Sequence, residues 1–372
     1  MAKAVKSAAK KKSILTDRSY SFLRNYINNP SPVGFESSGQ KLWLDYIKPW
    51  VDTTYTDPYG TAVGILNPKA DFKVVLEAHA DEISWFVNYV NPDGLLYLKR
   101  NGGVDHQIAP GQRVFVHGGK GPVKAVFGWP AIHTRLGNPD AKEQQPKVDN
   151  LFLDCGARNK KEVEALGIHI GSVVTYQDGM DELAHDYLIG RAFDNRIGGF
   201  MIAEVSRLLK ENKKQLPYGL YFVNAVQEEV GLRGAEMIAR RIKPDIAIIT
   251  DVTHDTSTPM VNKIIEGDIA CGKGPSLAYG PAVHNKLLDV VKLTAEKKKI
   301  PVQFRTVSRS TGTDTDSFAY ANEGCPSVLI SIPLRYMHTT VEMLHRNDIE
   351  QTILLMYETL LNIGPKTNLR YL

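Results

Sequence analysis

The sequence is poor in cysteine, and the three cysteines that it has are far apart. Cys155, Cys271 and Cys325 follow none of the short spacings that mark zinc ribbons, redox motifs or disulfide frameworks. A disulfide-stabilised secreted domain and a thiolate-bound structural metal are therefore not expected. The pattern predicts reduced thiols in a cytoplasmic protein.

The chain also lacks long apolar runs and a strong charge of either sign. No stretch reaches the ~20 apolar residues that a membrane-spanning helix needs. The formal net charge is +4, and part of it comes from five lysines within residues 1–13. This segment has no signal-peptide core, and we interpret it as a disordered, solvated basic tail. We therefore expect neither a nucleic acid nor a membrane as a partner.

What the chain does have is length and a regular alternation of patterns. Its 372 residues, 43% of them hydrophobic, can form a large core and suggest two domains. Short apolar runs alternate with amphipathic segments, which predicts an α/β fold with a doubly wound, mostly parallel sheet. The predicted strands are two within 53–66, then 73–78, 220–225, 246–249 and 327–332; the predicted helices are 14–50 (broken by a loop), 197–208, 232–242, 285–299 and 349–363.

A different pattern interrupts this alternation between residues 83 and 184. Short alternating runs are separated there by glycine pairs, and a helix is expected near residues 160–166. We predict a β-rich, barrel-like domain inserted into the α/β domain, which comprises residues 14–82 and 185–372. A polar surface loop is expected at residues 139–146.

Two adjacent carboxylates, Glu228 and Glu229, follow the apolar run at 220–225. At a strand end, like charge and burial raise the pKa of both groups. A metal ion reverses that cost for one carboxylate and leaves the other free to act as a base. For an isolated pair, a solvated loop tip is the simpler interpretation.

The pair is not isolated, because other strand ends carry histidine or aspartate. In open α/β sheets, ligands bind beyond the carboxyl ends of the strands. Oxygen and imidazole donors suit zinc, cobalt or manganese, and an open cluster of them is typical of a catalytic site with two ions. Singly, each residue also fits an ordinary histidine or a turn cap. The five candidate ligands are His79, Asp194, Glu229, Asp251 and His338.

Several segments of the chain, in this order, resemble the M42 family of metallo-aminopeptidases, the tetrahedral, glutamyl- and leucyl-type enzymes. The resemblance covers nearly the whole chain after the basic tail. It implies a zinc-peptidase-like three-layer sandwich for the α/β domain. The matching segments are His79–Ile83, Phe193–Gly198, Gln227–Ala235, Asp251–Thr253 and Leu334–His338, with weaker matches at 272–275 and 312–314.

The resemblance assigns the five candidates to two divalent ions, zinc or cobalt and possibly manganese. Asp194 is expected to bridge the ions. His79 and Asp251 are expected to complete one site, and Glu229 and His338 the other.

The resemblance also assigns roles next to the ions. Asp81 is expected to hold the imidazole of His79, which fixes its tautomer and raises its basicity. Glu228 is expected to act as the general base that activates a metal-bound water. In related enzymes the peptide after the bridging aspartate is cis, so a cis bond is expected between Asp194 and Asn195.

The expected substrates are short peptides, which lose their N-terminal residue. We expect the specificity pocket to include residues 310–316, with Thr313, Asp314 and Arg335 as substrate-binding residues. The resemblance further implies a homo-oligomer, from a dimer to a tetrahedral dodecamer, in which the insert is the dimerisation and assembly domain.

Two other functions are compatible with parts of the sequence. A glycoside hydrolase also uses paired carboxylates, and some proteins resembling this family carry an endoglucanase label. That chemistry has no need for the histidines and aspartates at neighbouring strand ends. A catalytically inactive binding module is the other alternative, but every expected metal and base residue is present.

Overall fold

The computed structural model describes residues 13–136 and 145–372. The predicted basic tail, apart from Ser13, and most of the predicted polar loop at 139–146 lie outside the described residues. Among the described residues, none of the helices is long and apolar enough to cross a membrane.

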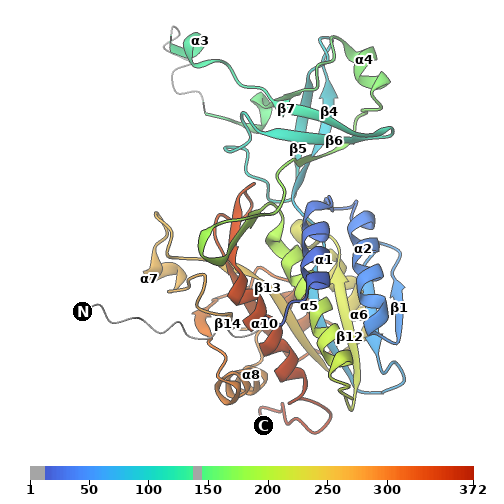
Figure 1. The fold of residues 1–372 in the computed structure, drawn as a ribbon, viewed down its shortest axis with the longest axis vertical. Helices are drawn as coiled ribbons and strands as arrows, with labels where there is room; N and C mark the ends of the chain where they lie inside the picture. The colour runs from blue at the N-terminus through green and yellow to red at the C-terminus, as the bar shows by residue number, and fades with distance from the viewer. Residues whose placement is uncertain (1–12, 137–144) are drawn as a thin grey trace, which may run out of the picture.

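The main sheet has eight strands, and its centre is parallel (Figure 1). In spatial order they are β1 (Thr53–Thr56), β2 (Ala62–Leu66), β12 (Gly219–Ala225), β3 (Lys73–His79), β13 (Ile246–His254), β16 (Ser327–Leu334), β14 (Ser276–Tyr279) and β15 (Gln303–Thr306). Strands β12, β3, β13 and β16 are parallel neighbours, whereas β2 and β14 pair antiparallel at either side. The predicted α/β fold with a mostly parallel sheet is confirmed.

The central strands form where the sequence is mostly apolar. Every residue of β12 and of β16 is buried, as expected for strands covered on both faces. Strand β13 continues to His254, five residues beyond the predicted run at 246–249. The longest helix, α5 (Phe193–Glu211), packs on β3, β12 and β13 and is covered in turn by α1, α2 and α10. The other α-helices of this part are α1 (Asp17–Asn28), α2 (Ser37–Ile47), α6 (Arg233–Ile242), α7 (Lys263–Glu266), α8 (Asn285–Lys298), α9 (Thr315–Ala319) and α10 (Arg346–Leu360).

A closed six-stranded barrel stands off one end of this domain, at the top of Figure 1. It has a hydrophobic core of its own, built around Trp85, Val114 and Phe127. The predicted β-rich, barrel-like insert is therefore present, although the exact division at residues 83 and 184 stays a prediction. Its strands and helices are β4 (Ser84–Val90), β5 (Leu96–Asn101), β6 (Arg113–Gly118), β7 (Gly121–Phe127), β8 (Phe152–Asp154), β9 (Val173–Tyr176), α3 (Ile132–Leu136) and α4 (Lys160–Ala165).

A small three-stranded sheet is separate from the main sheet and from the barrel, and it was not predicted from the sequence. It consists of β10 (Asp181–Glu182), β11 (Tyr187–Gly190) and β17 (Glu342–His345). Strand β11 leads directly into α5, so Asp194 reaches the site from the start of that helix. Asp194 was expected to follow a strand of the main sheet. It follows β11 of the small sheet instead.

Candidate metal centre

The register of the parallel strands brings distant side chains to one edge of the sheet. His79 is the last residue of β3, and it pairs with Ala225 at the end of β12. Glu77 pairs with Ile249 of β13, which places Asp251 two residues further along, level with His79. The chain after β12 then supplies Glu228 and Glu229, and the chain after β16 supplies His338.

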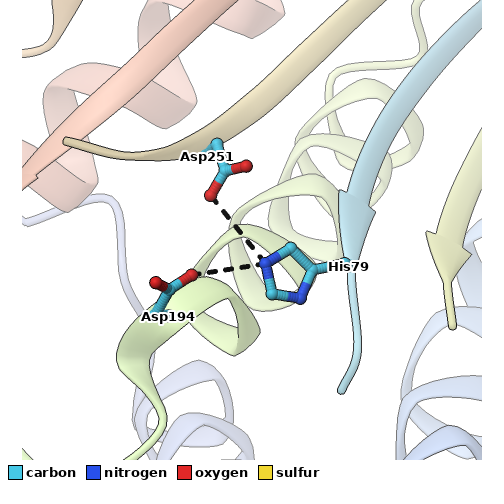
Figure 2. A group of neighbouring side chains, drawn as sticks. All are labelled: His79, Asp194 and Asp251. Atoms are coloured by element: carbon cyan, nitrogen blue, oxygen red, sulfur yellow. Dashed lines mark ion pairs between the residues drawn. The ribbon is translucent and has the colours of Figure 1, made fainter. Parts of the chain in front are cut away.

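His79 and the carboxylates of Asp194 and Asp251 converge from three elements (Figure 2). The Nε2 atom of His79 lies 3.3 Å from Asp194 Oδ1 and 3.9 Å from Asp251 Oδ1. All three residues are buried, and the side chain of His79 is only 2% exposed. This group has the residue types and the spacing to hold a metal ion.

A second group forms around the other oxygen of the same aspartate. His338 Nε2 lies 3.3 Å from Asp194 Oδ2 and 3.3 Å from Glu229 Oε1. Two ligands about 2.1 Å from an ion at a tetrahedral angle are about 3.4 Å apart, so these separations fit ligands that share an ion. Asp194 thus presents one oxygen to each histidine, and the donor set fits two divalent cations.

Asp81 connects the His79 strand to the turn that carries the glutamates. Its carboxylate is fully buried and accepts the backbone N–H groups of Glu228 (3.0 Å) and Glu229 (3.1 Å). It also lies 3.4 Å from Nδ1 of His79, an atom that makes no hydrogen bond within the described residues, so the orienting role of Asp81 stays a prediction. The turn is a 3-10 segment, Glu228–Val230, closed by Gly231 with φ of +111°, a value that favours glycine.

Glu342, which the sequence analysis missed, plays the corresponding part for the other ligands. It is buried in β17, and its two oxygens accept the backbone N–H groups of Asp194 (3.0 Å) and His338 (2.8 Å). The available signal was its position four residues after His338. A single glutamate near a candidate ligand is usually an ordinary surface residue, so there was no reason in the sequence to select Glu342.

Burial and like charge shape the electrostatics of the cluster. Burial raises the pKa of Glu228 to about 10 and that of Asp251 to about 7. Burial pulls the pKa of His338 down, but hydrogen bonds to Asp194 and Glu229 outweigh it and raise the pKa to about 12. Without a metal, these raised pKa values mean that protons on the cluster reduce the repulsion between its carboxylates. Metal cations can replace those protons.

The peptide between Asp194 and Asn195 is cis, which confirms the expectation from the family resemblance. The Asn195 side chain is buried and donates to the carbonyl of Thr250, next to Asp251 (2.7 Å). Its oxygen accepts the N–H of Gly198 in α5 (3.2 Å). Asn195 thus ties the start of α5 to β13.

A cavity of about 280 Å³ opens over the cluster. Thr313, one of the three predicted substrate-binding residues, lines it. Asp314 is instead buried beside Glu77, and Arg335 pairs with Asp255 (2.8 Å) and is not among the lining residues. The lining residues are His79, Asp194, Glu228, Glu229, Asp251, Val252, Thr253, His254, Arg305, Thr311, Gly312, Thr313, Met337 and His338.

Comparison with known proteins decides the family. The family model described as M42 glutamyl aminopeptidase matches residues 60–355. A lysyl aminopeptidase of Pyrococcus furiosus is 31% identical over 93% of this chain and 98% of its own length. The chain belongs to the M42 family. This M42 protein is accordingly a metal-dependent aminopeptidase, a peptide hydrolase.

Solved structures agree with this assignment. The TET aminopeptidase from a marine sediment Thaumarchaeota archaeon superposes with a TM-score of 0.90 at 29% identity, covering 94% of this chain and 98% of its own. The TET1 peptidase of Pyrococcus horikoshii, which can assemble into a tetrahedron or a large octahedral shell, has a TM-score of 0.81 at 25% identity, with 91% and 98% coverage. A Thermotoga maritima protein named an endoglucanase has a TM-score of 0.73 at 25% identity, with 92% and 99% coverage.

Proposed function

We propose that this M42 protein is a two-metal aminopeptidase that removes the N-terminal residue from short peptides. The observation that carries the proposal is the position of Asp194, whose two oxygens face two different histidines at 3.3 Å each. A bridging carboxylate between two ions requires this arrangement.

His79, Asp251 and Asp194 would hold one ion, and Glu229, His338 and Asp194 the other. Zinc and cobalt fit this donor set best, with manganese a further candidate. When bound, the ions supply Lewis acidity at the scissile carbonyl and make a water molecule acidic.

Glu228 is the proposed general base. It lines the cavity, and its Oε2 lies 3.9 Å from His79 Nε2, whereas its neighbour Glu229 contacts His338 at 3.3 Å. We assign Glu228, the carboxylate of the pair farther from a histidine, to the reacting groups; it also forms a candidate metal group with His79 and Glu229. It would accept a proton from the attacking water and deliver that proton to the nitrogen of the leaving amine.

The matched pair Glu228→Gln and Glu229→Gln tests this division of roles. Glu228→Gln should lower kcat on an aminoacyl amide by about 10²–10⁴-fold while metal affinity is largely retained. Glu229→Gln should weaken metal affinity directly. If Glu228→Gln instead loses metal and keeps its rate per bound ion, the roles are exchanged.

Glycoside hydrolysis is the second candidate, because a protein of the same fold is named an endoglucanase. Sugar-binding clefts rely on an aromatic platform, but no Phe, Tyr or Trp is among the described residues that line this cavity. Glycoside hydrolysis also gives no role to the paired histidines. Assays on aminoacyl amides and on a soluble β-glucan, with and without a chelator, separate the two activities and also detect an inactive binding module.

We further propose that the barrel is an assembly module. It is closed, has its own core and stands off the catalytic sheet, so it can present a self-complementary surface, and its Gly103 carbonyl also contacts Nδ1 of His338 in the site (3.2 Å). The Pyrococcus horikoshii relative forms shells. Light scattering should give a mass of several chains, up to about twelve; a mass near 41.4 kDa at micromolar concentration would instead favour a lid over the substrate cleft.

A further inference from the structure

Arg305 is the arginine among the described residues that line the cavity. It lies in β15, at the edge of the main sheet, and shares the cavity with Thr311 and Thr313. Arg305 is not among the site residues predicted from the sequence. The rest of the ionisable lining consists of carboxylates and histidines.

The guanidinium of Arg305 has no partner within the described part of the chain. Its Nε is buried and makes no hydrogen bond. Asp251 and Glu266 act on it electrostatically, but no ion pair within 4 Å links it to any described carboxylate. A buried guanidinium N–H without an acceptor is costly, so an acceptor that arrives with a ligand is strongly favoured.

We propose that Arg305 binds the side-chain carboxylate of an acidic N-terminal residue, glutamate or aspartate, and so sets the specificity of the enzyme. The guanidinium fork matches a carboxylate in two parallel hydrogen bonds. The cavity is small and contains both Arg305 and the candidate metal ligands, so the carboxylate must belong to a residue beside the scissile bond. The inference rests on the proposed aminopeptidase function and adds the substrate class.

Family membership does not provide this substrate class. The family model carries the name glutamyl aminopeptidase, whereas the Pyrococcus furiosus relative is a lysyl aminopeptidase. The ammonium group of a lysine side chain in this cavity would be repelled by the Arg305 cation. The carboxylate of a glutamate would be attracted to it. The discriminating residue is therefore on this chain itself.

A free C-terminal carboxylate of a short peptide offers the same chemistry. Aminoacyl p-nitroanilides separate the two sources because they have no C-terminal carboxylate. The substrates are the Glu, Leu and Lys p-nitroanilides, together with the dipeptide Leu-Ala as the free acid and as the amide.

The variants are Arg305→Gln, which removes the charge, and Arg305→Glu, which reverses it. The control is Arg309→Gln, because Arg309 is exposed in the following loop and is not among the lining residues. Metal content and the thermal unfolding midpoint of each variant show whether it is folded and loaded.

The wild-type enzyme should prefer Glu p-nitroanilide over Leu p-nitroanilide in kcat/KM. Arg305→Gln should lower the Glu/Leu ratio by about 10- to 100-fold, mainly through KM, and Arg305→Glu should shift the preference toward Lys. Arg309→Gln should leave the ratio unchanged.

Three results would overturn the assignment: a wild-type preference for Leu or Lys, an unchanged ratio in Arg305→Gln, or a dependence on Arg305 only for the free-acid dipeptide. An absence of metal-dependent hydrolysis of every aminoacyl substrate contradicts the proposed function itself, so the two failures are distinguishable.

Discussion

Replacing Asp81 by asparagine tests how the candidate site is held together. Asp81 accepts two backbone N–H groups, from Glu228 and Glu229, and faces Nδ1 of His79. Asparagine has nearly the same shape but only one acceptor oxygen, so its amide N–H₂ must point at one of these donors. The substitution therefore leaves at least one buried donor unsatisfied.

An unsatisfied buried donor costs about 1–3 kcal/mol. The substitution also removes a negative charge next to His79 and the backbone of Glu228 and Glu229, and that charge favours bound cations. We therefore expect metal affinity to fall by about 10–100-fold, the range typical for groups that orient metal ligands.

Metal affinity would be measured by chelator competition, and the stability of the metal-free protein by urea denaturation. Asp255→Asn is a matched control, because Asp255 is also buried and accepts two backbone N–H groups, from Ser257 (2.7 Å) and Cys271 (2.9 Å), away from the cluster. It should leave metal affinity unchanged. Equal affinity of Asp81→Asn and the wild type would refute the reasoning, and so would an equal loss in Asp255→Asn.

Two further predictions concern pH and stability. Burial raises the pKa of Asp251 from 3.8 to about 7, so below pH 7 a metal ion must displace a proton there. Affinity should then fall about tenfold per pH unit for each proton released between pH 7 and 5, with calorimetry in two buffers showing the release; a flat profile would contradict this. Arg196 is fully buried and donates to the carbonyls of Tyr26, Ile27 and Asn29 at the end of α1. Arg196→Met should lower the free energy of unfolding by about 3–5 kcal/mol in urea denaturation, and a loss below about 1 kcal/mol would contradict that role.

The sequence predicted the main sheet well because its central strands are covered on both faces. Strands β3, β12 and β16 are mostly apolar runs, and amphipathic helices such as α5 and α6 lie between strands along the chain. That pattern is local and has few alternative interpretations. The barrel was recognisable from a different local pattern, because its short alternating strands follow one another with few helices between them.

The three-stranded sheet could not be predicted, because its strands have two to four residues and pair over long distances. Tyr187 of β11 pairs with His345 of β17, more than 150 residues away. Strands this short have no detectable period. Their partners are fixed by the packing of the larger domain around them.

For the candidate site, strand ends were enough to nominate its residues, but their roles came from the family resemblance. His79 and His338 lie 259 residues apart, a separation that no local spacing rule can relate. Arg305 was missed because a single arginine in a short edge strand resembles any exposed cation. Only the fold shows that it faces the same cavity as the carboxylates.

Two carboxylates, Asp81 and Glu342, are not among the proposed ligands. They connect the chain segments that carry those ligands. Asp81 joins His79, a proposed ligand of one ion, to Glu229, a proposed ligand of the other. Glu342 joins Asp194, the proposed bridge, to His338. Asp251 and His79 are positioned by the register of the main sheet. The separation between the two proposed ion sites is therefore set by hydrogen bonds from the backbone to Asp81 and Glu342. A change in either carboxylate should disturb both ions, whereas a change in a single non-bridging ligand acts first on one.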